Sequence, residues 1–216
     1  MAARLRRRTA SVLALSLLFS AGAAGARRQR PQDTAQTWAA GPVRWLLRPE
    51  EAKELRRLRD ERAVAAFIEA FWRRRDPGPG APGQALKTFS ERVRAADQLY
   101  TDGDRRGSLT PRGRVIVLLG APPALRYSQR AVPTLEPERE HGQPVLTTRI
   151  ATLETWIYGP DDLTPALALK LEAAGGEPSL SFVFEVDDDR SKLIEGEEFL
   201  DPAAAAWVRQ EAEPSP

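Results

Sequence analysis

Two carboxylates and two aromatic side chains are the residues of this 216-residue chain whose types and spacing could support chemistry. Glu154, Trp156 and Tyr158 alternate along one segment, so an extended strand would place all three on one face. Glu185 lies in a second alternating segment and could supply another carboxylate. Carboxylates about 5–9 Å apart suit glycoside hydrolysis. Glu154 and Glu185 are therefore candidates for the acid/base pair of a hydrolase acting on cell-surface polymers, and all four residues are candidates for a binding cleft.

The alternative for these residues is structural. Aromatic side chains at strand spacing are core residues more often than ligand-binding residues. Trp156 and Tyr158 would then pack beneath helices, and Glu154 would pair with an arginine. The sequence favours this alternative, because no nucleophile or complete catalytic set accompanies the carboxylates.

Other reactive or metal-binding patterns are incomplete. His141 is the single histidine, no cysteine is present, and no serine lies in a nucleophile motif. Asp187, Asp188 and Asp189 lack the alternate spacing and the glycine of a calcium loop, so we expect a solvated turn, with calcium binding together with Glu195, Glu197 and Glu198 as the alternative. The sequence thus predicts no cofactor, no metal and no catalytic residue, which leaves a binding protein as the leading interpretation.

The first 26 residues have the three parts of an export signal. Four arginines precede an apolar run over residues 9–20, and small residues follow it. The run is shorter than the ~20 residues of a membrane-spanning helix, which favours cleavage over anchoring. We expect cleavage near Ala23 or Ala26, no transmembrane segment afterwards, and a location in the periplasm or outside the cell.

The charge of the chain changes when this signal is removed. The whole sequence has 32 basic and 30 acidic residues, a net charge of +2. Residues 1–26 contain four of the arginines and no acid, so the remainder has a net charge of −2. This composition does not support nucleic-acid binding. We expect the partner to be a protein or another envelope component.

Hydrophobic periodicity predicts helices in the first half of the chain. Residues 27–41 have no apolar period and predict a flexible arm. Helices are predicted over residues 49–59, 61–75 and 84–100. The second has the clearest stripe, which includes Phe71 and Trp72, and Asp76 with the following proline ends it. We expect one of the arginines before Asp76 to pair with it or to cap helix carbonyls.

Extended patterns dominate the second half. The apolar run over residues 115–119 predicts a central strand, covered on both faces. Strands are also predicted over residues 152–158, 180–186 and 192–194, an exposed loop over residues 128–144, and a helix over residues 203–211. The predicted fold class is α+β, with N-terminal helices packed on a small, mostly antiparallel sheet and a short C-terminal helix. The domain is predicted to span residues 42–212.

Several short motifs occur in a fixed order along the chain. The first contains Phe71, Trp72, Arg74, Arg75, Asp76 and Pro77; the next contains Arg112, Gly113, Arg114, Gly120, Pro122 and Pro123; the last contain Glu154, Trp156 and Tyr158, then Phe182 and Phe184. This pattern, over residues 43–194, resembles the GWxTD domain, a module of exported bacterial proteins that has no assigned activity. The resemblance therefore implies an exported domain and no particular activity, and the interpretation as a binding module rests on the absence of a catalytic set of residues.

The Gly-Trp-x-Thr-Asp motif that names the family is degraded here. Gly107 and Thr110 remain, but Ser108 replaces the tryptophan and Pro111 replaces the aspartate. We expect this segment to be architectural, with Gly113 at a position where a Cβ would crowd the neighbouring backbone.

Overall fold

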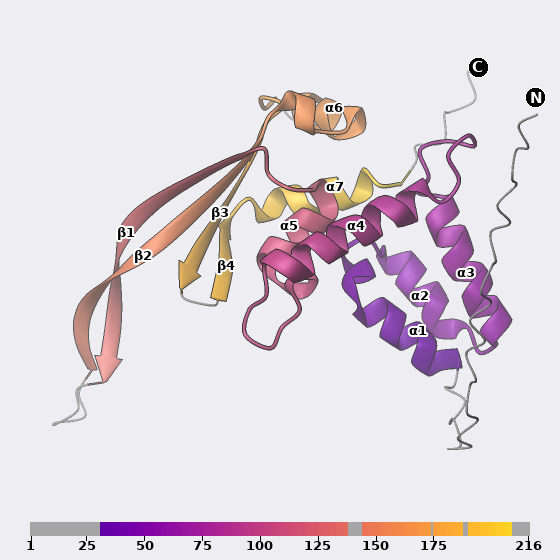
Figure 1. The fold of residues 1–216 in the computed structure, drawn as a ribbon, viewed down its shortest axis with the longest axis horizontal. Coiled ribbons are helices and arrows are strands. Elements are labelled where there is room, and N and C mark those ends of the chain that lie inside the picture. The colour runs from indigo at the N-terminus through magenta and orange to yellow at the C-terminus, as the bar shows by residue number, and fades with distance from the viewer. Residues whose placement is uncertain (1–30, 138–143, 174, 188–189, 209–216) are drawn as a thin grey trace, which may run out of the picture.

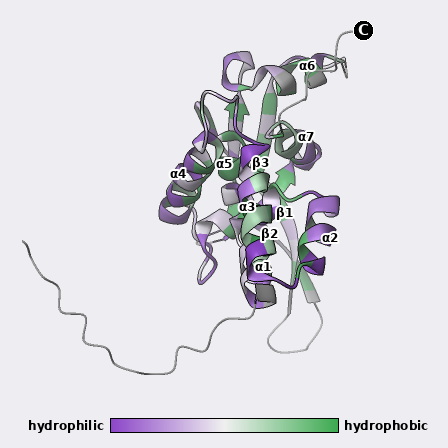
Figure 2. Cartoon of the chain, turned by 90° about the vertical axis from the view of Figure 1, so that its right-hand side faces the viewer, coloured by the Kyte–Doolittle hydropathy of each residue, from purple (hydrophilic) through white to green (hydrophobic). Residues whose placement is uncertain are grey.

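The structure is a computed structural model and describes residues 31–137, 144–173, 175–187 and 190–208. Its fold is α+β, as the sequence predicts (Figure 1). The α-helices are α1 (Pro31–Ala40), α2 (Pro49–Arg57), α3 (Glu61–Arg73), α4 (Gln84–Leu99), α5 (Pro111–Leu119), α6 (Pro165–Ala173) and α7 (Leu200–Ala205). Short 3-10 helices are η1 (Pro42–Trp45), η2 (Gly107–Leu109), η3 (Pro160–Asp162) and η4 (Glu197–Phe199). Hydrophilic residues gather on the outer helices α2 and α4 (Figure 2).

The sheet contains β1 (Ala124–Pro137), β2 (Pro144–Tyr158), β3 (Leu180–Asp187) and β4 (Arg190–Glu195), in chain order and antiparallel throughout. Trp156 pairs with Phe182, so both side chains lie on one face, and both are fully buried. β1 and β2 pair along their whole length, whereas β3 pairs only with residues 152–158 of β2. The far part of the β1–β2 hairpin therefore projects beyond the rest of the sheet (Figure 1).

Helix α5 occupies the position for which the sequence predicts a central strand, and that prediction is wrong. Residues 115–118 are each at most 3% exposed, because α4, α7, η1 and β4 surround the helix. A continuous apolar run has no period, so it cannot distinguish a buried strand from a buried helix.

Capping residues explain why this run is helical. The Thr110 side chain accepts a hydrogen bond from the Gly113 N–H at 3.0 Å, and Pro111 is the first helical residue. Gly120 ends the helix with a φ of 95°, a conformation that favours glycine. The helix signal was therefore present in the sequence, at the ends of the run rather than inside it.

Two segments predicted to be irregular form regular structure. Residues 31–40 are helix α1 rather than a flexible arm, and the Trp38 ring lies 5.0 Å from that of Phe71. The folded region therefore begins before residue 42. The described parts of the predicted loop, residues 128–137 and 144, belong to β1 and β2. In both cases the stabilising partner is distant in sequence or lies across a strand pair, so local composition does not reveal it.

The remaining predictions correspond well with the structure. Helices α2, α3 and α4 and strands β2, β3 and β4 are confirmed, whereas α6 has no counterpart in the sequence analysis. The C-terminal helix ends earlier than predicted, and Trp207 follows it. Residues 1–30, His141, Asp188, Asp189 and residues 209–216 lie outside the described residues.

Candidate functional site

The arginines that follow α3 surround a buried carboxylate. Nη1 and Nη2 of Arg75 donate to the two oxygens of Glu51 at 3.1 and 2.8 Å, and both side chains are almost fully buried. Arg74 donates to the same carboxylate at 3.0 Å. Burial alone would raise the pKa of Glu51, but hydrogen bonds from Arg75 and from the Arg48 backbone outweigh burial and lower the pKa to about 2. This cluster fixes the end of α3 against the start of α2.

Asp76 caps the next helix instead of pairing with an arginine. Its two oxygens accept hydrogen bonds from the N–H groups of Gly83 and Ala85 at 2.8 and 2.9 Å. Arg75 Nη1 also donates to the Phe71 carbonyl at 3.1 Å, which is the carbonyl cap that the sequence offered as the alternative. Phe71 and Trp72 pack against Trp38 and Phe89, which belong to α1 and α4, so α3 contacts helices through these residues.

The family signature forms a close contact between backbones. Gly107 and Gly113 are both buried, and a Cβ on Gly113 would lie 1.7 Å from the Gly107 carbonyl oxygen. The Thr110 hydroxyl donates to that same carbonyl at 2.7 Å. Ser108 is fully buried, and its N–H donates to Asp97 at 2.8 Å. Pro122 and Pro123 then lead the chain from α5 into β1.

Glu154 lies inside a buried network instead of a cleft. It is 4% exposed, accepts a hydrogen bond from Trp156 Nε1 at 2.6 Å, and accepts another from Arg112 Nη1 at 3.2 Å. Arg112 also approaches Asp102 at 3.9 Å and lies over the Tyr100 ring. Burial and the nearby Glu154 carboxylate raise the pKa of Tyr100. Glu154 and Trp156 thus hold β2 against the start of α5.

Tyr158 and Arg114 connect α5 to neighbouring parts of the fold. Tyr158 is 1% exposed, and its hydroxyl donates to the Gly120 carbonyl at 2.9 Å. Burial raises the pKa of this hydroxyl far above its ordinary value. Arg114 donates to Glu197 at 2.7 Å and lies over the Trp45 ring. Arg112, Arg114, Glu154, Trp156 and Tyr158 therefore connect α5 to other elements, whereas Phe71 to Asp76 connect α3 to α1, α2 and α4.

Glu185 lies on the opposite face of the sheet from Glu154. Glu154 pairs with Phe184 in the β2–β3 register, so the adjacent residue Glu185 points the other way. Glu185 instead accepts a hydrogen bond from Arg149 and forms an ion pair with Arg130 at 3.8 Å. The structure therefore does not bring the two candidate carboxylates together.

An apolar stripe on the projecting hairpin is the feature that the sequence analysis missed. Tyr127, Leu135, Leu146 and Ile150 are between 61% and 68% exposed. Their register places them on the face that carries Glu154 and Trp156, so the stripe continues the buried face of the sheet into solvent. We call these four residues the arm face. The β-branched residues in the segment 145–153 could have indicated a strand, but the nearby prolines favoured a loop.

The hairpin has two further properties that bear on binding. β1 is the edge strand of the sheet, so one side of its backbone has no neighbouring strand among the residues that the structure describes. Residues 124–158, from the start of β1 to the end of β2, contain four arginines and four glutamates, so their charges balance. The projecting hairpin is therefore distinguished by its exposed apolar face and not by its net charge.

The described residues contain no helix that is long and apolar enough to span a membrane. In the same part of the chain, no three acidic or histidine side chains gather as a metal site would require.

Fold and site together define an α+β scaffold whose motif residues connect its helices and strands and whose exposed hairpin carries an apolar face. The family model of the GWxTD domain matches residues 21–133, just over half of the chain. The chain belongs to the GWxTD domain family. The matched segment ends within β1, so the Glu154, Trp156 and Tyr158 motif lies beyond it. Comparisons with curated proteins and with solved structures gave no match.

Proposed function

We propose that this chain is an exported, non-catalytic binding module that engages a partner protein through the arm face. The observation that carries the proposal is the stripe of four large apolar side chains, each more than 60% exposed. Exposed large apolar side chains gathered on one face of an element typically mark an interaction site. The open edge of β1 offers backbone hydrogen bonds to the same partner.

The arm face itself indicates the kind of partner. Arg126, Arg130 and Arg149 lie on the face opposite the arm face, and Glu185 at the base of the hairpin pairs with two of them. We infer a partner protein with an apolar patch that covers the arm face.

Export is proposed from the sequence of residues 1–26, which lie outside the described residues. A signal peptide would deliver the module to the periplasm or the exterior. The intact mass of protein isolated from these compartments tests this, and a product beginning after Ala23 or Ala26 is expected. Recovery of only the full-length chain from the membrane fraction would contradict it.

The hydrolase alternative has less support. Its two carboxylates, Glu154 and Glu185, point to opposite faces of the sheet, and Glu154 is buried against Arg112. An acid/base pair must face one substrate from both sides of the scissile bond.

Site-specific photocrosslinking tests the proposed function. A benzophenone amino acid is placed at Tyr127 or Leu146 on the arm face, and at the matched exposed positions Leu99 and Leu169 elsewhere. With envelope extract of the source organism, we expect one protein adduct of the same mass at both arm positions and none at the control positions. Adducts at all four positions, at none, or of twice the mass of the chain would contradict the proposal.

A further inference from the structure

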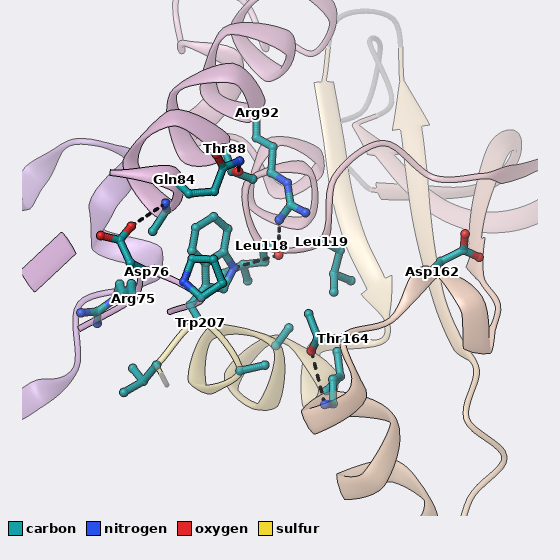
Figure 3. Close-up of a pocket in the computed structure, with 16 residues that line it drawn as sticks. Arg75, Asp76, Gln84, Thr88, Arg92, Leu118, Leu119, Asp162, Thr164 and Trp207 are labelled. Carbon is teal, nitrogen blue, oxygen red and sulfur yellow. Dashed lines mark hydrogen bonds between the residues drawn. The ribbon is translucent and has the colours of Figure 1, made fainter. Parts of the chain in front are cut away.

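A pocket at the C-terminal end of α5 is lined by residues of α4, α5, α6 and the C-terminal segment, among others (Figure 3). Its volume is about 390 Å³, which lies in the range of small-molecule sites. The walls are largely apolar and include Leu118, Leu167 and Trp207. The apolar walls would suit a ligand with a hydrocarbon portion.

Arg92 is the cationic group between these walls. Its Nη1 donates to the carbonyls of Val117 and Leu118 at 3.3 and 2.7 Å, and its guanidinium lies 5.2 Å from the centre of the Trp207 ring. Trp207 Nε1 donates to the same Leu118 carbonyl at 2.9 Å. These contacts hold the guanidinium in one position at the C-terminal end of α5.

Arg92 forms no ion pair with any residue that the structure describes, and its hydrogen bonds there use Nη1 alone. Burial lowers the pKa of Arg92, which reflects the cost of removing its charge from water. Asp76 and Asp162 also line the pocket, but each accepts backbone N–H bonds, and they lie at opposite ends of it with Arg92 between them (Figure 3).

We propose that this pocket binds an alkyl carboxylate, with the carboxylate on Nε and Nη2 of Arg92 and the hydrocarbon chain against Trp207, Leu118 and Leu167. A guanidinium with donors still available is suited to a carboxylate. An alkyl chain fits better than a peptide, because the largely apolar walls offer few hydrogen-bond partners for peptide amides.

Titration calorimetry of the full chain with sodium decanoate, below its micellar concentration, tests this site. We expect one bound decanoate per chain and at least tenfold weaker binding of decanol, because a charge-assisted hydrogen bond contributes about 1.5–3 kcal/mol. Arg92→Met should weaken decanoate binding by a similar factor, whereas Arg94→Met, an exposed position on the same helix, should not.

Thr88→Phe provides an independent test if Arg92→Met unfolds, since it fills the pocket from a partly exposed position. It should abolish decanoate binding. Equal affinity for decanol and decanoate would overturn the proposal, as would wild-type affinity in folded Arg92→Met or Thr88→Phe. Loss of decanoate binding through Tyr127→Ser alone would place the ligand on the arm face and would also overturn it.

Discussion

Gly113 lies directly against Gly107, with 1.7 Å between the Gly107 carbonyl oxygen and the position that a Gly113 Cβ would occupy. Gly107 is packed in the same way on Ala96, whose carbonyl oxygen lies 1.9 Å from a Cβ built on Gly107. The backbones of α4, η2 and α5 therefore touch without intervening side chains. The glycines of the family signature are explained by this contact alone, without a ligand.

Gly113→Ala should destabilise the fold strongly. The added methyl group meets backbone atoms that cannot rotate away. We therefore expect the free energy of unfolding to fall by about 1–3 kcal/mol or more. Gly80→Ala is the matched control, because nothing lies within 4 Å of its Cβ position; it should change stability by less than about 1 kcal/mol. Urea unfolding measures both, and equal stabilities of the two variants would show that α5 is not packed as described.

Restoring the two replaced residues of the Gly-Trp-x-Thr-Asp motif tests whether this segment is a structural turn or a functional site. Ser108→Trp places a large ring at a fully buried position and should cost about 1–3 kcal/mol. Pro111→Asp adds an acid to the first turn of α5, where the helix dipole favours it, so stability should change by less than about 1 kcal/mol. Neither change should alter crosslinking through the arm face. Stronger binding in Ser108→Trp would instead identify the turn as a functional site.

The Glu51–Arg75 pair predicts acid sensitivity. The pKa of Glu51 falls from an ordinary 4.5 to about 2 in the folded chain, so its contribution is complete above pH 4.5 and is lost as the pH falls through 2. Glu51→Gln should lower the free energy of unfolding by about 3–5 kcal/mol at neutral pH, because Arg75 remains buried without a carboxylate partner. Its stability should also vary less between pH 4.5 and 2 than that of wild type.

Unfolding at several pH values checks this prediction, with Glu50→Gln on the exposed side of the same turn as the control. Parallel pH profiles for wild type and Glu51→Gln would contradict it.

Loss of the Glu154–Arg112 contact should lower the stability of the fold. Arg112→Met leaves Glu154 buried without its cation and should cost about 3–5 kcal/mol in urea unfolding. Arg94→Met removes an exposed arginine and should have little effect. An Arg112→Met variant as stable as wild type would indicate that Glu154 is not held by this pair.

An element could be predicted from the sequence where its hydrophobic period lies within its own residues. The stripe that contains Phe71 and Trp72 repeats every turn, so α3 could be predicted from its own residues. Residues 115–118 are buried on all sides, which removes the period, and their helical state depends on the caps at Thr110 and Gly120.

The site was harder to predict than the fold. Glu154 and Glu185 both lie on predicted strands, but the β2–β3 register that separates their faces is set by pairing between distant segments. Tyr127 and Ile150 belong to a hairpin whose strands are supported mainly by each other. Neither face of the projecting strands packs on a core in the part of the chain that the structure describes. Their residues therefore lack the alternation of polar and apolar side chains that the burial of one face imposes.

Shortening the hairpin tests whether the arm face binds the partner protein. Gln129 and Thr152 face each other, so residues 130–151 can be replaced by Asn-Gly, which favours a tight hairpin turn. The wild-type and shortened chains are immobilised and exposed to envelope extract, and retention of the crosslinked partner is measured together with the melting temperature. We predict a folded variant, within a few degrees of wild type, that no longer retains the partner. A folded variant that retains it as strongly as wild type would contradict the account.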